Sequence, residues 1–218
     1  MNRLQIKICG ITNLEDARAC TELGADMIGL NFYSQSPRYI QPKRAREILE
    51  AIPRGVRSVG IFVDPTATEV GSVAKVAGLE CVQLHGDVPP ETCRELARKF
   101  RAIRAFSTDG QFKPEDVRPF SEKCDVLLDA HHAELRGGTG VTCDWSLARA
   151  TLPFARFLIL SGGLNAQNVG RAIAAVTPHA VDVCSGVESA PGAKDYRAIE
   201  RFIAAVRAAE RLAGASSL

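Results

Sequence analysis

The stretch LQIKICGITNLEDARACTELG, residues 4–24, carries two different hydrophobic patterns in succession. Polar and apolar residues alternate over residues 4–9, which is typical of a β-strand. Asn13 then precedes a leucine and two acidic residues, the signal of a helix N-terminus, and Gly24 stands where such a helix would end. This stretch therefore predicts a strand followed directly by a helix, with Cys9 at the end of the strand.

The same order of strand and helix recurs along the chain. Eight apolar, strand-like runs alternate with segments of helical character, such as residues 42–52. Repeated strand–helix–strand units imply parallel strands joined by right-handed crossovers. The units predict an α/β fold, a single (β/α)8 TIM barrel domain over residues 1–218 with a loose tail at 213–218. The strand-like runs are residues 4–9, 26–32, 57–63, 81–85, 101–106, 124–129, 154–160 and 180–184.

An open, doubly wound sheet is the alternative arrangement for the same alternation of strands and helices. It is disfavoured because no G-x-G-x-x-G motif follows the first strand and because the units are evenly spaced. In a barrel, the functional site lies at the carboxyl ends of the strands.

Composition limits the partners that we expect. The 218 residues are 46 % hydrophobic and 24 % charged, with a formal net charge of +2. No basic run favours nucleic acid, and the apolar runs are too short to span a bilayer, so neither nucleic acid nor a membrane is expected as a partner. The seven cysteines form no C-x-x-C pair, and no signal-peptide pattern precedes the first strand, which predicts free thiols in the cytoplasm. We expect a monomer or a homodimer.

Polar residues end three of the predicted strands: Cys9 the first, His85 the fourth and Asp129 the sixth. At one barrel mouth, a thiol and a carboxylate form a possible pair of base and acid. Each residue also has an ordinary structural explanation, because cysteines often pack as small hydrophobic residues and an aspartate can cap a loop. His85 fits a histidine held by hydrogen bonds at least as well as one that contacts a substrate.

Glycine-rich segments follow the last three strands, at residues 137–140, 161–169 and 184–188. Barrels of this kind commonly bind phosphate with backbone N–H groups after strands seven and eight. The segments would also serve as tight turns, and for residues 137–140 the two explanations weigh equally. The residues that we expect to bind phosphate are Gly162, Gly163, Ser185 and Gly186.

Arg38 lies in SPRYI, residues 36–40, after the second predicted strand. An arginine is usually a surface residue. At the barrel mouth it would instead form a fork for a substrate carboxylate. The sequence pattern leaves both explanations open.

Strand alternation predicts a buried ion pair beneath Cys9. Lys7 shares the face of Cys9, whereas the isoleucines on either side of Lys7 face the helices, so Lys7 points into the barrel. An unpaired charge is costly there. The expected partner is Asp182, which shares a face with Cys184 on strand eight, the neighbour of strand one in a closed barrel. Lys7 would lie about 6–7 Å from Cys9 and lower the pKa of its thiol.

Eight motifs, in order along residues 4–205, resemble the phosphoribosylanthranilate isomerase family of tryptophan biosynthesis. Several of them are long enough to be specific, so chance is not a serious explanation. The motifs are KICGIT, SPRYI, VGIFV, QLHG, LLDA, GGTGVTCDW, LSGGLNAQNV, and VDVCSGVE followed by GAKD.

The resemblance implies an enzyme that converts N-(5-phosphoribosyl)anthranilate to 1-(2-carboxyphenylamino)-1-deoxyribulose 5-phosphate by an Amadori rearrangement. It assigns Asp129 as the general acid that protonates the furanose ring oxygen, and Cys9 as the general base that removes the C2 proton. Arg38 would face the anthranilate group, and the glycines after strands seven and eight would hold the phosphate. The nitrogen of the substrate serves as the electron sink, so neither a metal nor a cofactor is expected.

These two roles set physical conditions on the side chains. A thiol with a pKa of about 8.5 is only a few per cent thiolate at neutral pH, so Cys9 benefits from a nearby cation. Asp129 must be protonated to act as an acid, so burial is expected to raise its pKa above about 3.9.

The sequence departs from the family pattern at a few positions. His131 and His132 stand where a small hydroxyl residue is more common. Cys143 precedes Asp-Trp where an aromatic residue is usual, and Cys184 stands where serine is common. None of these changes affects the proposed acid and base.

Two other functions are compatible with a barrel that binds phosphate. One is another sugar-phosphate isomerase or synthase, for which a lysine acid, a glutamate base or paired aspartates would be expected instead of Cys9 with Asp129. The other is a non-catalytic barrel that binds a phosphorylated metabolite without converting it. A measurement of turnover distinguishes this non-catalytic barrel from an enzyme.

Overall fold

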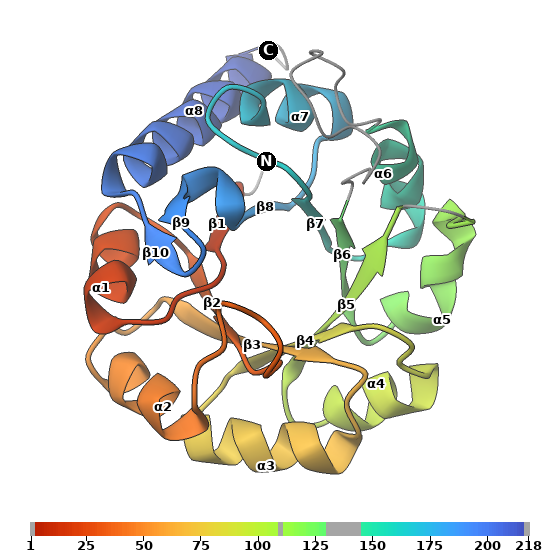
Figure 1. The fold of residues 1–218 in the computed structure, drawn as a ribbon. Coiled ribbons are helices and arrows are strands. Elements are labelled where there is room, and N and C mark those ends of the chain that lie inside the picture. The colour runs from red at the N-terminus through yellow and green to blue at the C-terminus, as the bar shows by residue number, and fades with distance from the viewer. Residues whose placement is uncertain (1–2, 109–110, 130–144, 216–218) are drawn as a thin grey trace.

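The chain forms a closed barrel of parallel strands inside a ring of helices (Figure 1). The structure, a computed structural model, describes residues 3–108, 111–129 and 145–215. The barrel strands follow one another in chain order, and the last strand, β8, pairs in parallel with the first, β1. The predicted (β/α)8 barrel is confirmed.

Strands and helices alternate around the barrel. The strands are β1 Gln5–Ile8, β2 Met27–Asn31, β3 Arg57–Val63, β4 Cys81–His85, β5 Arg101–Ser107, β6 Asp125–Asp129, β7 Leu158–Ser161 and β8 Ala180–Val183. The α-helices are α1 Leu14–Glu22, α2 Pro42–Glu50, α3 Ala67–Ala77, α4 Pro90–Leu96, α5 Arg118–Ser121, α6 Ser146–Thr151, α7 Val169–Val176 and α8 Tyr196–Ala215. Short 3₁₀ helices span Pro114–Val117, Leu152–Phe154 and Ser185–Val187, and a small antiparallel pair follows β8, formed by β9 Glu188–Ala190 and β10 Ala193–Lys194.

The first helix begins and ends at the predicted signals. The Oδ1 atom of Asn13 accepts a hydrogen bond from the backbone N–H of Asp16 at 2.8 Å, which caps α1. Gly24, just beyond the helix, has a φ angle of 103°, a conformation that glycine adopts at little cost. The chain then enters β2.

The seventh strand is shorter than the run at residues 154–160 predicts, because β7 begins only at Leu158. Phe154 completes a 3₁₀ turn, and the Nε atom of Arg156 pairs with Asp125 at 3.1 Å. The residues before Leu158 are therefore held by a turn and an ion pair, neither of which the hydrophobic pattern reveals.

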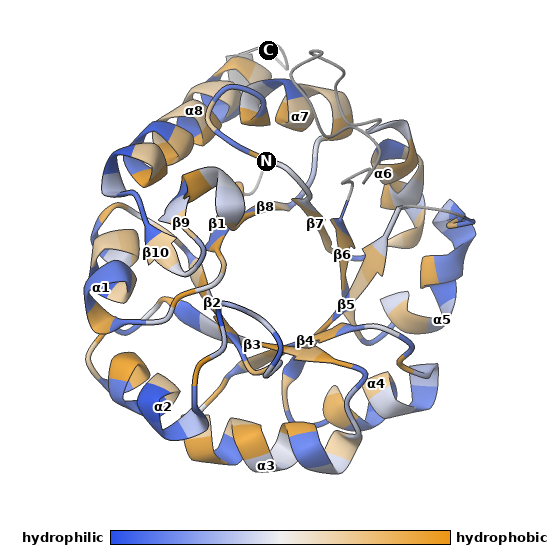
Figure 2. Ribbon diagram, in the orientation of Figure 1, coloured by the Kyte–Doolittle hydropathy of each residue, from blue (hydrophilic) through white to orange (hydrophobic). Residues whose placement is uncertain are grey.

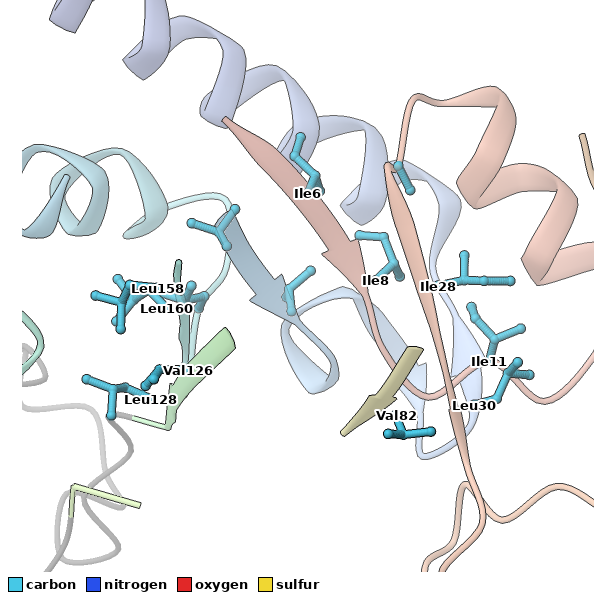
Figure 3. Close-up of a cluster of buried hydrophobic side chains, with 14 of the residues drawn as sticks. Ile6, Ile8, Ile11, Ile28, Leu30, Val82, Val126, Leu128, Leu158 and Leu160 are labelled. Atoms are coloured by element: carbon cyan, nitrogen blue, oxygen red, sulfur yellow. The ribbon is translucent and has the colours of Figure 1, made fainter. Parts of the chain in front are cut away.

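Apolar side chains divide between two layers. Ile6 and Ile8 belong to the larger cluster, between the strands and the helices, and Figure 3 shows them with residues of other strands. A smaller cluster that includes Met27, Val59 and Leu127 fills the barrel. In Figure 2 the strands are largely apolar, whereas the helices carry both polar and apolar residues. This division follows from the alternation of side chains along each strand.

Some sequence predictions fall outside the described residues: the glycine segment 137–140, His131, His132 and Cys143. Helix α8 includes the predicted tail up to Ala215, and residues 216–218 are not described. Within the described ranges, no helix has both the length and the apolar character that crossing a membrane requires.

Candidate active site

The carboxyl ends of the strands bring the predicted polar residues to one end of the barrel. Cys9 directly follows β1, His85 is the last residue of β4, and Asp129 is the last residue of β6. All three side chains are partly exposed, in contrast to the apolar strand residues around them. The strands are parallel, so their carboxyl ends share one mouth.

A buried ion pair lies beneath Cys9. Lys7 and Asp182 are register partners across β1 and β8, and Lys7 Nζ lies 2.9 Å from Asp182 Oδ1. Ser161 donates a hydrogen bond to the other carboxylate oxygen at 3.2 Å. Burial alone would lower the pKa of Lys7, but the carboxylate of Asp182 outweighs it and raises the pKa, so Lys7 stays charged at neutral pH. The predicted ion pair is confirmed.

The surroundings of Cys9 favour its thiolate and bring its pKa down to about 7. The largest cause is the neighbouring thiol of Cys184. Burial opposes the shift, and the charge of Lys7 supports it, with a further contribution from Lys194. The expected influence of Lys7 is present, but the neighbouring thiol contributes more. Gly29 also leaves room for the thiol, since a Cβ at that position would come within 2.8 Å of Cys9 Sγ.

Arg38 is held at the barrel mouth by a buried carboxylate. Its Nε atom lies 2.8 Å from Glu188 Oε1, and its Nη2 atom lies 2.6 Å from Glu188 Oε2. Lys194 Nζ contacts Glu188 Oε1 at 2.9 Å. Burial opposes ionisation of Glu188, but the two cations outweigh it and lower its pKa to about 2. Two cations thus share one carboxylate, which leaves an excess of positive charge beside Cys9.

Glu188 and Lys194 are absent from the site predicted from sequence. They stand in the motifs that follow strand eight, but the position of the β9–β10 pair that carries them depends on loop geometry. The sequence does contain a signal for an acidic partner such as Glu188, because the charge of an arginine at a barrel mouth is costly unless an acidic group lies near it. Arg38 is therefore neither a free surface residue nor a fork without a partner.

A cavity of about 190 Å³ opens between the ends of β6, β7 and β8. Asp129, Gly162, Gly163 and Ser185 all line it, so the structure brings the predicted acid together with most of the predicted phosphate-binding residues. Cys9, Arg38, His85 and Gly186 do not line this cavity. Its remaining lining residues are Ser161, Leu164, Asp182, Val183 and Cys184.

The glycines of the last two loops have different structural reasons. Gly162 and Gly163 have φ angles of 96° and 61°, in the left-handed region that favours glycine. Gly186 instead allows a close approach of two loops, because a Cβ there would come within 2.0 Å of the carbonyl oxygen of Leu164. The loops after β7 and β8 are thus packed directly against each other.

His85 is kept neutral inside the barrel mouth. Its Nε2 atom lies 2.7 Å from Gln83 Nε2. Burial, with a smaller effect of the charge on Lys7, lowers the pKa of His85 to about 4. At neutral pH the ring is therefore a hydrogen-bonding group and carries no charge.

The described side chains can supply proton transfer and anion binding. No group of three or more His, Cys, Asp or Glu residues within residues 3–108, 111–129 and 145–215 could hold a metal ion. A thiol that ionises near neutral pH, a carboxylate at the cavity and loops rich in glycine suit acid–base chemistry on a phosphorylated molecule.

Comparisons with known proteins agree with one another. A family model of N-(5'phosphoribosyl)anthranilate (PRA) isomerase matches residues 6–205. The N-(5'-phosphoribosyl)anthranilate isomerase of Thermotoga neapolitana is 47 % identical over 202 residues, which cover 92 % of this chain and 97 % of the relative. The crystal structure of phosphoribosyl anthranilate isomerase from Thermotoga maritima superposes with a TM-score of 0.87 at 43 % identity, covering 94 % of this chain and 100 % of that one. A structure of such an isomerase in complex with reduced 1-(o-carboxyphenylamino)-1-deoxyribulose 5-phosphate gives a TM-score of 0.85 at 42 % identity, with the same coverage of 94 % and 100 %.

Replacing Lys7 with methionine is expected to raise the pKa of the Cys9 thiol from about 7 to about 8 or higher, because the thiolate loses a buried cation. The rate of alkylation by iodoacetamide against pH measures this, with Cys9→Ser giving the background. Lys75→Met, at an exposed position of α3, is the matched control. If the alkylation rate of Cys9 depends on pH in Lys7→Met as it does in the wild type, Lys7 does not lower the pKa of Cys9.

Glu188→Gln is expected to lower the free energy of unfolding by about 3 kcal/mol, because it leaves a buried lysine without its carboxylate. Lys194 has a fully buried side chain in this pair. The control is Glu91→Gln, since Glu91 pairs with Arg94 only at the surface and its loss should cost less than about 1 kcal/mol. Urea unfolding of both variants checks the difference, and equal losses would be inconsistent with the buried network.

Gly186→Ala is expected to destabilise the protein by about 1–3 kcal/mol, because the added methyl group would collide with backbone. Gly71→Ala is the matched control: apart from its chain neighbours and the backbone of its own helix, no atom lies within 4 Å of a Cβ at this position, so alanine should stabilise α3 by up to about 1 kcal/mol. Thermal unfolding would show opposite signs for the two variants. A neutral Gly186→Ala would mean that the two loops are not in contact.

Proposed function

Because this chain belongs to the N-(5'-phosphoribosyl)anthranilate isomerase family, we propose that Cys9 and Asp129 are the base and the acid of its reaction. The chain is an isomerase of tryptophan biosynthesis whose substrate is N-(5'-phosphoribosyl)anthranilate. The observation that carries the proposed mechanism is the position of Cys9 above the Lys7–Asp182 ion pair, at the same barrel mouth as Asp129, which lines the cavity.

The substrate has an anion at each end, and the site offers a place for both. Its phosphate is assigned to the loops after β7 and β8, where Gly162, Gly163 and Ser185 line the cavity. Its anthranilate carboxylate is assigned to Arg38. Glu188 engages Nε and Nη2 of Arg38, so the remaining terminal nitrogen, Nη1, is the group directed to the carboxylate.

The reaction begins with opening of the ribose ring. Asp129 donates its proton to the furanose ring oxygen as the bond from C1 to that oxygen breaks, which leaves a cationic Schiff base at C1 and a hydroxyl group in place of the ring oxygen. The positive nitrogen then acidifies the C2 hydrogen, because it can accept the electron pair that deprotonation releases. The substrate itself thus provides the electron sink.

Cys9 takes the C2 proton in the second step, and the resulting enolamine tautomerises to the ketone. A base must be ionised to do so. With a pKa of about 7, about half of the Cys9 side chains are thiolate at neutral pH, against a few per cent for an ordinary thiol. The cations Lys7 and Lys194 stabilise this thiolate. His85 is neutral, so it adds a hydrogen-bonding group to the barrel mouth and no further charge.

The test is turnover of freshly prepared phosphoribosylanthranilate, followed by the change in its fluorescence. Cys9→Ser and Asp129→Asn are each expected to reduce kcat by about 10²–10⁴-fold, the usual contribution of general acid or base catalysis. Cys20→Ser, which changes a buried cysteine of α1, is the matched control and should retain turnover. Full turnover by both site variants would discard the mechanism, and an inactive wild type that binds the product would point to a non-catalytic barrel.

The pH dependence of kcat/KM should follow the ionisation of Cys9. Because the reactive form needs Cys9 without its proton and Asp129 with one, the profile should be bell-shaped, with one limb centred near the Cys9 pKa of about 7 and a slope of about tenfold per pH unit on each side. Stopped-flow measurements between about pH 5 and pH 9, at intervals of about half a pH unit, would resolve the profile. A limb with its midpoint above about pH 8.5 would indicate an ordinary thiol.

A further inference from the structure

Cys9 has a second cysteine as its closest chemical neighbour. Across the seam between β1 and β8, Lys7 faces Asp182 at 2.9 Å. Cys9 and Cys184 are the residues that directly follow β1 and β8, two positions beyond this ion pair. The backbone N–H of Cys9 donates to the carbonyl of Val183 at 2.8 Å, so the two strands are still paired at this level.

The backbone spacing at this seam suits a disulfide. Paired strands lie about 4.8 Å apart, which falls within the range of roughly 4.4–6.8 Å between the Cα atoms of disulfide partners. Cys184 Sγ also lies beside the residue that follows Cys9, since a Cβ on Gly10 would come within 2.9 Å of it. The two sulfur atoms are thus neighbours before any reaction takes place.

Access distinguishes this pair from the other cysteines that the structure describes. Cys9 and Cys184 are partly exposed, and Cys184 lines the cavity at the mouth. Cys20, Cys81, Cys93 and Cys124 are buried. A small polar oxidant that enters the mouth therefore meets the Cys9–Cys184 pair first.

The two thiols also differ in character. Cys9 ionises near neutral pH, and the thiolate is the form that reacts with oxidants. The neighbouring Cys9, together with burial, raises the pKa of Cys184, and Cys184 Sγ donates a hydrogen bond to Glu188 Oε1 at 3.7 Å. One member is therefore the nucleophile, and the other remains a thiol beside it.

We propose that Cys9 and Cys184 form a peroxide-sensitive pair that closes into a reversible disulfide and thereby switches the isomerase off. The thiolate of Cys9 attacks one oxygen of hydrogen peroxide, the O–O bond breaks, and hydroxide leaves, so Cys9 becomes a sulfenic acid. The sulfur of Cys184 then attacks the sulfur of Cys9. The thiol proton joins the departing hydroxyl group, and water leaves as the disulfide forms. The two sulfur atoms together lose two electrons, which the peroxide accepts.

The inhibition rests on the proposed function, because a disulfide removes the base that takes the C2 proton. The formation of the disulfide does not rest on it. A small dithiol such as dithiothreitol reverses the reaction by exchange, which restores both thiols. Further oxidation of an unlinked Cys9 sulfenic acid would instead give a sulfinic acid, which a dithiol does not reduce.

The experiment treats the fully reduced, full-length protein with increasing hydrogen peroxide, blocks free thiols, and maps the linkages by mass spectrometry of an unreduced digest. Activity is measured on the same samples before and after dithiothreitol. We expect a Cys9–Cys184 cross-linked peptide that accumulates as activity falls, with at least about tenfold loss of turnover and recovery on reduction. Each variant is compared with its own untreated sample.

Two variants make the result specific. Cys184→Ser should still lose activity to peroxide but should regain less of it with dithiothreitol than the wild type does, because its unlinked Cys9 sulfenic acid oxidises further to a sulfinic acid. Cys124→Ser is the matched control, since Cys93 and Cys124 are a second close pair, with Cys124 Sγ 4.0 Å from the carbonyl oxygen of Cys93. This control should lose and regain activity as the wild type does.

Three results would overturn the proposal. One is the absence of the Cys9–Cys184 peptide at peroxide concentrations that inactivate the enzyme. Another is a Cys184→Ser protein that, after the same peroxide treatment, contains no more Cys9 sulfinic acid than the wild type does. The third is full turnover by a protein that carries the cross-link, which would overturn the switch and also the role of Cys9 as base, whereas failure of the proposed function alone would leave the cross-link in place.

Discussion

The ion pair between Lys7 and Asp182 is the interaction on which the rest of the site depends. It joins the first and last strands of the barrel at 2.9 Å, in a position where Lys7 is fully buried. An isolated ammonium group in that place would be costly, so the pair requires both strands to be in register. The register then decides which side chains stand above it, namely Cys9 and Cys184. Closure of the barrel and ionisation of the thiol therefore have one physical cause in common.

Above this pair, the site combines residues at the ends of strands with charged residues from the loops. The strands fix Cys9 and Asp129 at their ends, whereas Arg38, Glu188 and Lys194 come from the segments that follow β2 and β8. Sharing of one carboxylate by two cations keeps the mouth positive without leaving a lysine unpaired. Such a field suits a substrate with two anionic groups. The positive charges of Lys7 and Lys194 also favour the thiolate of Cys9, the proposed base.

The sequence predicts well what depends on periodicity and poorly what depends on loops. Alternation along residues 4–9 places Lys7 inside the barrel, and closure of the barrel then makes Asp182 its partner, as the structure confirms. The extent of β7 is missed because a 3₁₀ turn and the Arg156–Asp125 pair are not visible in a hydrophobic pattern. Glu188 is missed for a similar reason, since its contact with Arg38 joins residues 150 positions apart through two loops. The effect of Cys184 on the pKa of Cys9 requires the two thiols to be seen side by side.

In the proposed mechanism, the barrel makes Cys9 a base that is ionised at neutral pH. An NMR titration of protein with isotope-labelled cysteine tests it most directly, because the Cβ resonance of Cys9 changes when the thiol loses its proton, and the spectrum of Cys9→Ser assigns it. We expect a titration midpoint near pH 7, in line with a pKa of about 7. A midpoint at about 8.5 or above, the value of an ordinary thiol, would contradict it.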